Sequence, residues 1–180
     1  MKRLKSMVTK IDAVLRVVLA IMMTALVIDV TWQVLTRFIL PQPSSFTEEV
    51  ARFLLIWLSL LGGAYAYRER SHLGFNLLVK NMSVNKQVFV HKFSCVLVAF
   101  FAVFVLIVGG SNLVYLTWLL GQYSPVLDVP MAFVYIVIPA SGVLFLIYSI
   151  YFFLNNSMVR ITEQNSQTET ENSIKVSHND

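Results

Sequence analysis

Four long apolar stretches, separated by short polar segments, set the pattern of this chain. A membrane-spanning helix needs roughly 20 predominantly apolar residues. Four stretches come close to that length or exceed it, at approximately residues 13–35, 50–67, 93–116 and 129–154. The pattern therefore predicts an all-α integral membrane protein, in which residues 1–156 form a domain of four transmembrane helices surrounded by membrane lipid.

Two further segments have a different pattern. Between the second and third stretches, His72, Asn76 and Lys80 recur every four residues, with apolar residues on the opposite side. This spacing predicts a short amphipathic helix at approximately residues 72–82, which is too short to span and lies on the membrane surface. Residues 157–180 are rich in Ser, Thr, Asn, Gln and Glu, a composition that predicts a disordered tail.

Composition and charge placement support a membrane protein and give it an orientation. Hydrophobic residues make up 57% of the chain and charged residues 13%, against about 25% charged in soluble domains. The net charge is +4, and lysine and arginine gather before the first stretch and between the second and third. The positive-inside rule then predicts that both termini and the tail are cytoplasmic. Cations at the ends of spans indicate membrane orientation, and we expect no binding of nucleic acid.

The N-terminal apolar run resembles a signal peptide only superficially. No small-residue cleavage site follows it, because the run continues into Asp29 and Trp32. We therefore expect the first helix to be retained.

One polar stripe interrupts the first predicted span. Asp29, Gln33, Thr36 and Arg37 are spaced so that they share one face of a helix. A carboxylate near the centre of a bilayer costs about 2.5 kcal/mol or more, so the stripe is expected to face protein. It is either a proton or ion relay or a hydrogen-bonded contact between helices with Arg37 at the membrane interface, and the second interpretation is the simpler.

A charged cluster opens the second span. Glu48 and Glu49 fall in its first turn, where the helix dipole favours negative charge, and Arg52 follows within pairing distance of either. Glu48 is explained by the helix start. We expect Glu49 and Arg52 to pair and to anchor a contact with another protein.

The same span carries further signs of close packing. Trp57 lies in its middle, away from the interfacial zone where tryptophan is usually enriched. Gly62 and Gly63 make one end smooth, and small residues let helices approach closely in lipid. These three residues are predicted packing or interface positions.

The chain lacks the patterns of an enzyme or of a cofactor site. No metal-ligand spacing, nucleophile motif or phosphate-binding loop is present, and we predict no cofactor. His72, like the other two histidines, lies at a span end or in the tail, which argues for an interfacial polar residue and against a haem anchor. Four spans without repeated halves are also few for a complete carrier. A self-contained oligomeric transporter or channel that uses Asp29 remains the alternative to an accessory subunit.

The order of several short motifs resembles one known family. Residues 33–38, 47–57, 61–64 and 70–78 are similar, in sequence and spacing, to the DctQ family, the small membrane subunits of tripartite ATP-independent periplasmic (TRAP) transporters. The similarity covers about the first half of the chain. Phe46 stands where many relatives have Trp, and Asn76 stands where Asp is common.

The resemblance implies a function and a set of partners. Such a subunit lies in the bacterial inner membrane and pairs with a large DctM-type permease subunit that moves the solute. A periplasmic substrate-binding protein delivers a carboxylate such as sialic acid or a C4-dicarboxylate, and a sodium gradient drives uptake. The resemblance carries over five positions as structural and interface residues, and it assigns none of them to solute or sodium. They are Arg37, Glu49, Arg52, Trp57 and His72.

Overall fold

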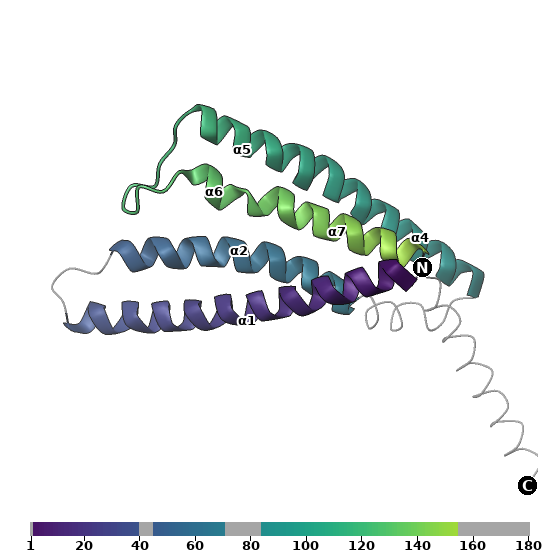
Figure 1. Ribbon diagram of the computed structural model, residues 1–180, viewed down its shortest axis with the longest axis horizontal. Coiled ribbons are helices and arrows are strands. Elements are labelled where there is room, and N and C mark those ends of the chain that lie inside the picture. The colour runs from purple at the N-terminus through teal and green to yellow at the C-terminus, as the bar shows by residue number, and fades with distance from the viewer. Residues whose placement is uncertain (1, 40–44, 71–83, 155–180) are drawn as a thin grey trace, which may run out of the picture.

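The computed structural model describes residues 2–39, 45–70 and 84–154. These residues fold into helices joined by short connections (Figure 1). In chain order the elements are α1 (Lys2–Ile39), α2 (Ser45–Arg70), α4 (Val84–Phe101), the π-helix η1 (Ala102–Gly109), α5 (Gly110–Leu119), α6 (Met131–Tyr135) and α7 (Val137–Leu154).

Four of the resulting helical segments are long and apolar enough to cross a membrane: Ser6–Ile39, Ser45–Glu69, Lys92–Leu119 and Met131–Phe153. The third combines α4, η1 and α5, and the fourth combines α6 and α7. The predicted fold class, an all-α membrane protein with four spanning helices, is therefore confirmed. The predicted surface helix at 72–82 and the predicted tail at 157–180 lie outside the described residues.

The four spans run alternately up and down, so each end of the bundle collects particular segments (Figure 1). At one end, here called the joined end, α1 begins, α2 ends, α4 begins and α7 ends. At the other, here called the loop end, α1 gives way to α2, and residues 120–130 connect α5 to α6. The spans converge at the joined end, whereas the α1–α2 hairpin and the other two spans diverge toward the loop end (Figure 1).

The core lies mainly toward the joined end. One cluster of buried side chains there comprises Val8, Ala64, Cys95, Tyr148, Tyr151 and Phe152. A second cluster, formed by Leu15, Leu61 and Val137, continues it along the bundle. Only 11% of the apolar window of the first span is buried, and the same share of the second. On α1 most of the large apolar side chains are exposed, as lipid or another membrane protein requires, whereas most of those on α2 are half-buried.

The third and fourth spans are irregular where they pack on each other. Gly142 of α7 lies against η1, and a Cβ added to it would come within 2.7 Å of Leu106 Cβ and 3.2 Å of the Ala102 carbonyl oxygen. The fourth span breaks at Ile136, between α6 and α7. Pro139 accounts for the break, because it has no amide hydrogen for the carbonyl four residues earlier.

Replacement of Gly142 by alanine should destabilise the protein. The new methyl group meets the backbone of η1, and overpacking of this kind costs about 1–3 kcal/mol. Gly63→Ala is the matched control, since its nearest neighbour, Phe145 Cζ, would lie at an ordinary 3.8 Å. Thermal unfolding in detergent should show a lower midpoint for Gly142→Ala only. Equal midpoints for the two variants would contradict the close contact between η1 and α7.

Candidate functional site

The residues singled out in the sequence fall on α1 and α2, and most of them lie toward the loop end. Those on α1 are Asp29, Gln33 and Arg37, and those on α2 are Glu48, Glu49, Arg52, Trp57, Gly62 and Gly63. His72 lies outside the described residues. The structure gives these positions different environments.

Glu49 fixes the connection between the third and fourth spans. Its side chain is only 8% exposed, and Oε2 accepts hydrogen bonds from the backbone N–H groups of Val126 (3.2 Å) and Leu127 (2.9 Å). A carboxylate that accepts two amide hydrogens forms stronger hydrogen bonds than a neutral acceptor does. Glu49 thereby ties the start of α2 to a loop 77 residues further along the chain.

The loop that Glu49 holds is itself closely folded. Tyr123 and Pro130 form an isolated β-bridge, and Ser124 donates its backbone N–H to the Val129 carbonyl at 2.9 Å. Asp128 has a positive φ of 51°, a conformation that few residues other than glycine adopt. The loop therefore presents a defined shape at the loop end.

Arg52 has a different partner from the one predicted. Its Nη2 lies 3.3 Å from Oε1 of Glu48, and the two side chains are 67% and 70% exposed. The predicted Glu49–Arg52 pair is therefore wrong. Helical spacing allows either pair. The physical reason is the rotation of α2, which turns Glu49 toward the amides of Val126 and Leu127 and leaves Glu48 on the exposed face with Arg52.

Trp57 makes its contact within the chain. Its Nε1 donates a hydrogen bond to the Val134 carbonyl oxygen at 3.1 Å, beside the break that precedes α7. The contact connects α2 to α6. Among the described residues Trp57 thus acts as a packing residue between the two halves of the bundle.

Gly62 and Gly63 lie on packed faces without being forced to be glycine. A Cβ at Gly62 would lie 3.9 Å from Leu19 Cδ2, and one at Gly63 would lie 3.8 Å from Phe145 Cζ. Both distances are ordinary van der Waals contacts. The two glycines pack against α1 and α7, and neither marks an especially close approach of two backbones.

Asp29 and Gln33 are the least satisfied polar residues of the predicted stripe. Asp29 Oδ2 and Gln33 Nε2 are buried, and neither has a hydrogen-bond partner within the part of the chain that the structure describes. Thr36, by contrast, is buried and donates to the Gln33 carbonyl at 3.0 Å, while Arg37 is exposed. The one carboxyl of the stripe, at its first position, thus leaves Oδ2 without a hydrogen bond among the described residues.

A charged cluster at the joined end was missed by sequence reasoning. Arg68 Nε lies 3.2 Å from Asp12 Oδ2, with both side chains less than a fifth exposed. The Tyr148 hydroxyl, in a fully buried side chain, donates to Asp12 Oδ1 at 2.8 Å. The Arg68 guanidinium also lies 4.9 Å from the centre of the Tyr151 ring and 5.4 Å from that of Phe152. This cluster, the Asp12–Arg68–Tyr148 contact, joins α1, α2 and α7.

One sequence signal pointed to it. Asp12 is the single acid in a basic N-terminal segment that contains Lys2, Arg3, Lys5, Lys10 and Arg16. Its partners are 56 and 136 residues away, so their proximity follows only from the arrangement of the helices.

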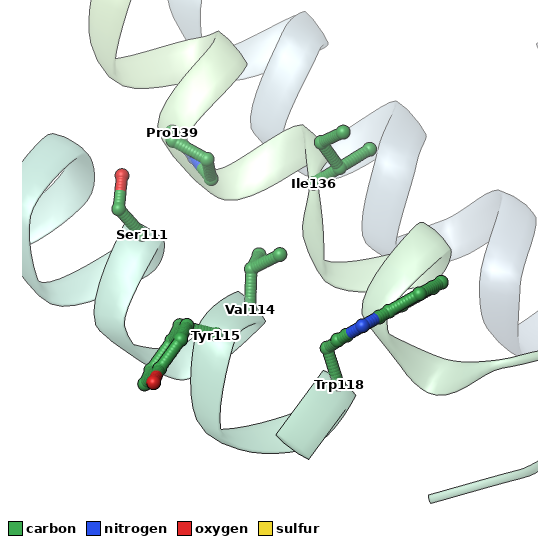
Figure 2. A pocket seen from close by; sticks show the side chains of 6 residues that line it. All are labelled: Ser111, Val114, Tyr115, Trp118, Ile136 and Pro139. Atoms are coloured by element: carbon green, nitrogen blue, oxygen red, sulfur yellow. The ribbon is translucent and has the colours of Figure 1, made fainter. Parts of the chain in front are cut away.

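A pocket of about 500 Å³ lies between α5 and the break in the fourth span (Figure 2). Its lining residues are Ser111, Val114, Tyr115, Trp118, Ile136 and Pro139. None of these side chains is a cation, so the pocket offers no counter-ion to a carboxylate. Within the described ranges, no group of three or more His, Cys, Asp and Glu side chains is placed to hold a metal ion.

Substitution of Arg68 by alanine should cost much more stability than substitution of Arg52. Arg68→Ala leaves the Asp12 carboxylate largely buried without its cation, a loss of about 3 kcal/mol. Arg52→Ala removes only an exposed pair and serves as the control. Unfolding of the two purified variants in detergent measures the difference. Similar midpoints would contradict a stabilising role for the Asp12–Arg68–Tyr148 contact.

Substitution of Glu49 by alanine should loosen the loop between the third and fourth spans. Loss of hydrogen bonds to a charged acceptor corresponds to about 1.5–3 kcal/mol. Amide hydrogen exchange at Val126 and Leu127 should therefore accelerate by about 10- to 100-fold. Glu48→Ala, one residue away on the exposed face, should leave both amides unchanged. Unaltered exchange in Glu49→Ala would show that the carboxylate does not hold the loop.

Comparison with known proteins identifies the family to which this chain is similar. Residues 26–157 match the family model described as "Tripartite ATP-independent periplasmic transporters, DctQ component". The sialic acid TRAP transporter small permease protein SiaQ of Vibrio cholerae is 38% identical over 72 residues, 40% of this chain and 40% of that protein. A Haemophilus influenzae protein, provisionally assigned as a TRAP transporter small permease protein, is 28% identical over 100 residues, 56% of this chain and 60% of that protein.

These two matches span less than two thirds of the length of the relatives. The family model, in contrast, covers the larger part of this chain, from within α1 to the end of α7. Members of this family are subunits of transporters, not enzymes. With four apolar helices and a match of this extent, the chain belongs to the DctQ family of tripartite ATP-independent periplasmic transporters.

Proposed function

We propose that this chain is the small permease subunit of a sodium-driven transporter, and that it forms a scaffold for a large DctM-type permease subunit that moves the solute. The observation that carries this proposal is the family match over residues 26–157. The exposed apolar side chains of α1 support it, because a helix that buries so little within its own chain has a wide face left for lipid or for a partner subunit.

The interface residues of the proposed complex lie on α1 and α2. Arg37 and the Glu48–Arg52 pair are exposed toward the loop end, where they are available to another protein. Glu49 and Trp57 contribute indirectly, because their hydrogen bonds hold the other half of the bundle in place. His72, carried over by resemblance, belongs to the same proposed set.

The proposed orientation places the joined end in the cytoplasm and the loop end in the periplasm. The distribution of lysine and arginine in the sequence supports it. The loop held by Glu49 then faces the periplasm, where a substrate-binding protein docks. The membrane concerned is the inner membrane of a bacterium.

The proposed solute is a carboxylate, with sialic acid as the first candidate. Its support is the 38% identity to the sialic acid small permease protein of Vibrio cholerae. This chain is assigned no contact with solute or with sodium, which pass through the large subunit.

A second candidate function rests on Asp29. Its buried, unpartnered carboxylate oxygen is the feature expected of an intramembrane acid that takes up protons or ions. In this alternative, several copies of the chain form a small transporter or channel by themselves.

Reconstitution separates the two candidates. Proteoliposomes that contain this chain, the large permease encoded beside it and the cognate binding protein should take up labelled sialic acid when a sodium gradient is applied. Omission of this chain should abolish uptake, and the chain alone should transport nothing. Uptake by the chain alone, lost in Asp29→Asn, would establish the second candidate and contradict the first.

A further inference from the structure

Two buried polar atoms on α1 lack partners within the described chain. Asp29 and Gln33 are four residues apart, so their side chains lie one above the other on the same helix face. Asp29 Oδ2 and Gln33 Nε2 are buried without a hydrogen bond, although both residues as a whole remain partly exposed. Other polar side chains of this helix are satisfied locally: Thr24 donates to the Ala20 carbonyl and Thr31 to the Val27 carbonyl.

Such a pair is costly in a membrane. Asp29 lies well inside the first spanning segment, Ser6–Ile39. No water is available in the hydrocarbon to replace a missing hydrogen bond, and an isolated charge there is expensive. Residues of this kind face protein or a water-filled cavity and pair with one another or with backbone carbonyls.

The cation on α2 that lies opposite Asp29 is already paired with another residue. Leu19 lies against Gly62, and Arg16 donates to the Tyr65 hydroxyl. Continuing this antiparallel register places Arg52 of α2 level with Asp29. The Arg52 side chain, however, points outward and pairs with Glu48 at 3.3 Å. Among the described residues, the Asp29 carboxyl therefore has no counter-ion.

We propose that Asp29 receives an arginine or lysine side chain from a membrane helix of the large permease subunit, while Gln33 donates its side-chain N–H to an acceptor on the same helix. This inference rests on the function proposed above and adds the chemistry of the contact. Charge complementarity selects a cation for the Asp29 carboxylate, and an arginine guanidinium, with five donors in a fixed plane, suits that acceptor. Gln33 Nε2, one turn further along the helix, is an N–H donor and needs an acceptor, such as a backbone carbonyl oxygen of the same partner helix.

The surface beside this pair fits a contact between helices. Ile28, Trp32 and Leu35 are large, exposed apolar residues on the adjacent stripe of α1. A polar contact flanked by large apolar side chains that exclude water is the arrangement found at energetically dominant points of interfaces. In the complex, the Asp29 contact would set the depth in the membrane at which α1 meets the large subunit, and the rotation of α1 about its axis.

The contact is tested by measuring association of the two purified subunits in detergent. The labelled chain is titrated with the large subunit, and the dissociation constant of the wild type is compared with that of Asp29→Asn and Asp29→Ala. Both variants should bind about 3- to 20-fold more weakly, the range for polar contacts between membrane helices. Thr31→Val, two residues from Asp29 and with its hydroxyl satisfied locally, is the control and should bind as the wild type does.

A second measurement identifies the cation. Each arginine and lysine in the membrane helices of the large subunit is replaced by methionine and combined with Asp29→Asn. At the partner position the double variant should lose no more affinity than either single variant, because the two losses report one shared contact.

Three results would overturn the inference. The first is that Asp29→Asn and Thr31→Val bind the large subunit with equal affinity while sodium-driven uptake stays intact. In that case the proposed function stands, but without this contact. The second is an Asp29 effect confined to the unfolding of the isolated chain or to its self-association. The third is failure of the wild-type chain to bind the large subunit at all, which would remove the proposed function as well.

Discussion

The buried contact of Asp12 with Arg68 and Tyr148 is the constraint on which the arrangement of the spans depends. It connects three helices at one end of the bundle, and the largest cluster of buried side chains surrounds it. The ion pair is acceptable there because Tyr148 and the rings of Tyr151 and Phe152 supply further polar and cation–π contacts. Asp12, Arg68 and Tyr148 thus satisfy one another within the described residues.

The opposite end is held by weaker and more dispersed means. Glu49 fixes one loop through two backbone hydrogen bonds, and Trp57 links α2 to the broken fourth span through one. Between these points the α1–α2 hairpin and the other spans diverge (Figure 1). The difference between the ends is physical: at the joined end, charge and aromatic packing act on the same residues, whereas at the loop end separate hydrogen bonds from Glu49 and Trp57 connect the elements.

Sequence patterns predicted the elements well and the partners of individual side chains poorly. Apolar length and composition were enough for four spans, because a membrane imposes both. The break in the fourth span also has a local cause, since Pro139 has no amide hydrogen for the carbonyl four residues earlier. The choice between Glu48 and Glu49 as partner of Arg52 needed the rotation of α2 about its axis, which a loop 77 residues away helps to determine. The Asp12–Arg68–Tyr148 contact was missed for a similar reason, as its members come from three separate helices.

The distribution of satisfied and unsatisfied polar groups separates what folds this chain from what assembles it. Asp12, Glu49 and Trp57 all have partners among the described residues, so their chemistry is used within the chain. Asp29 and Gln33 lie inside the first apolar stretch, and Asp29 Oδ2 and Gln33 Nε2 remain without partners there. If stability of the single chain were the sole requirement, apolar residues at these two positions would serve better. An acid at this point of α1 is therefore better explained by what α1 meets outside its own bundle than by the fold that carries it.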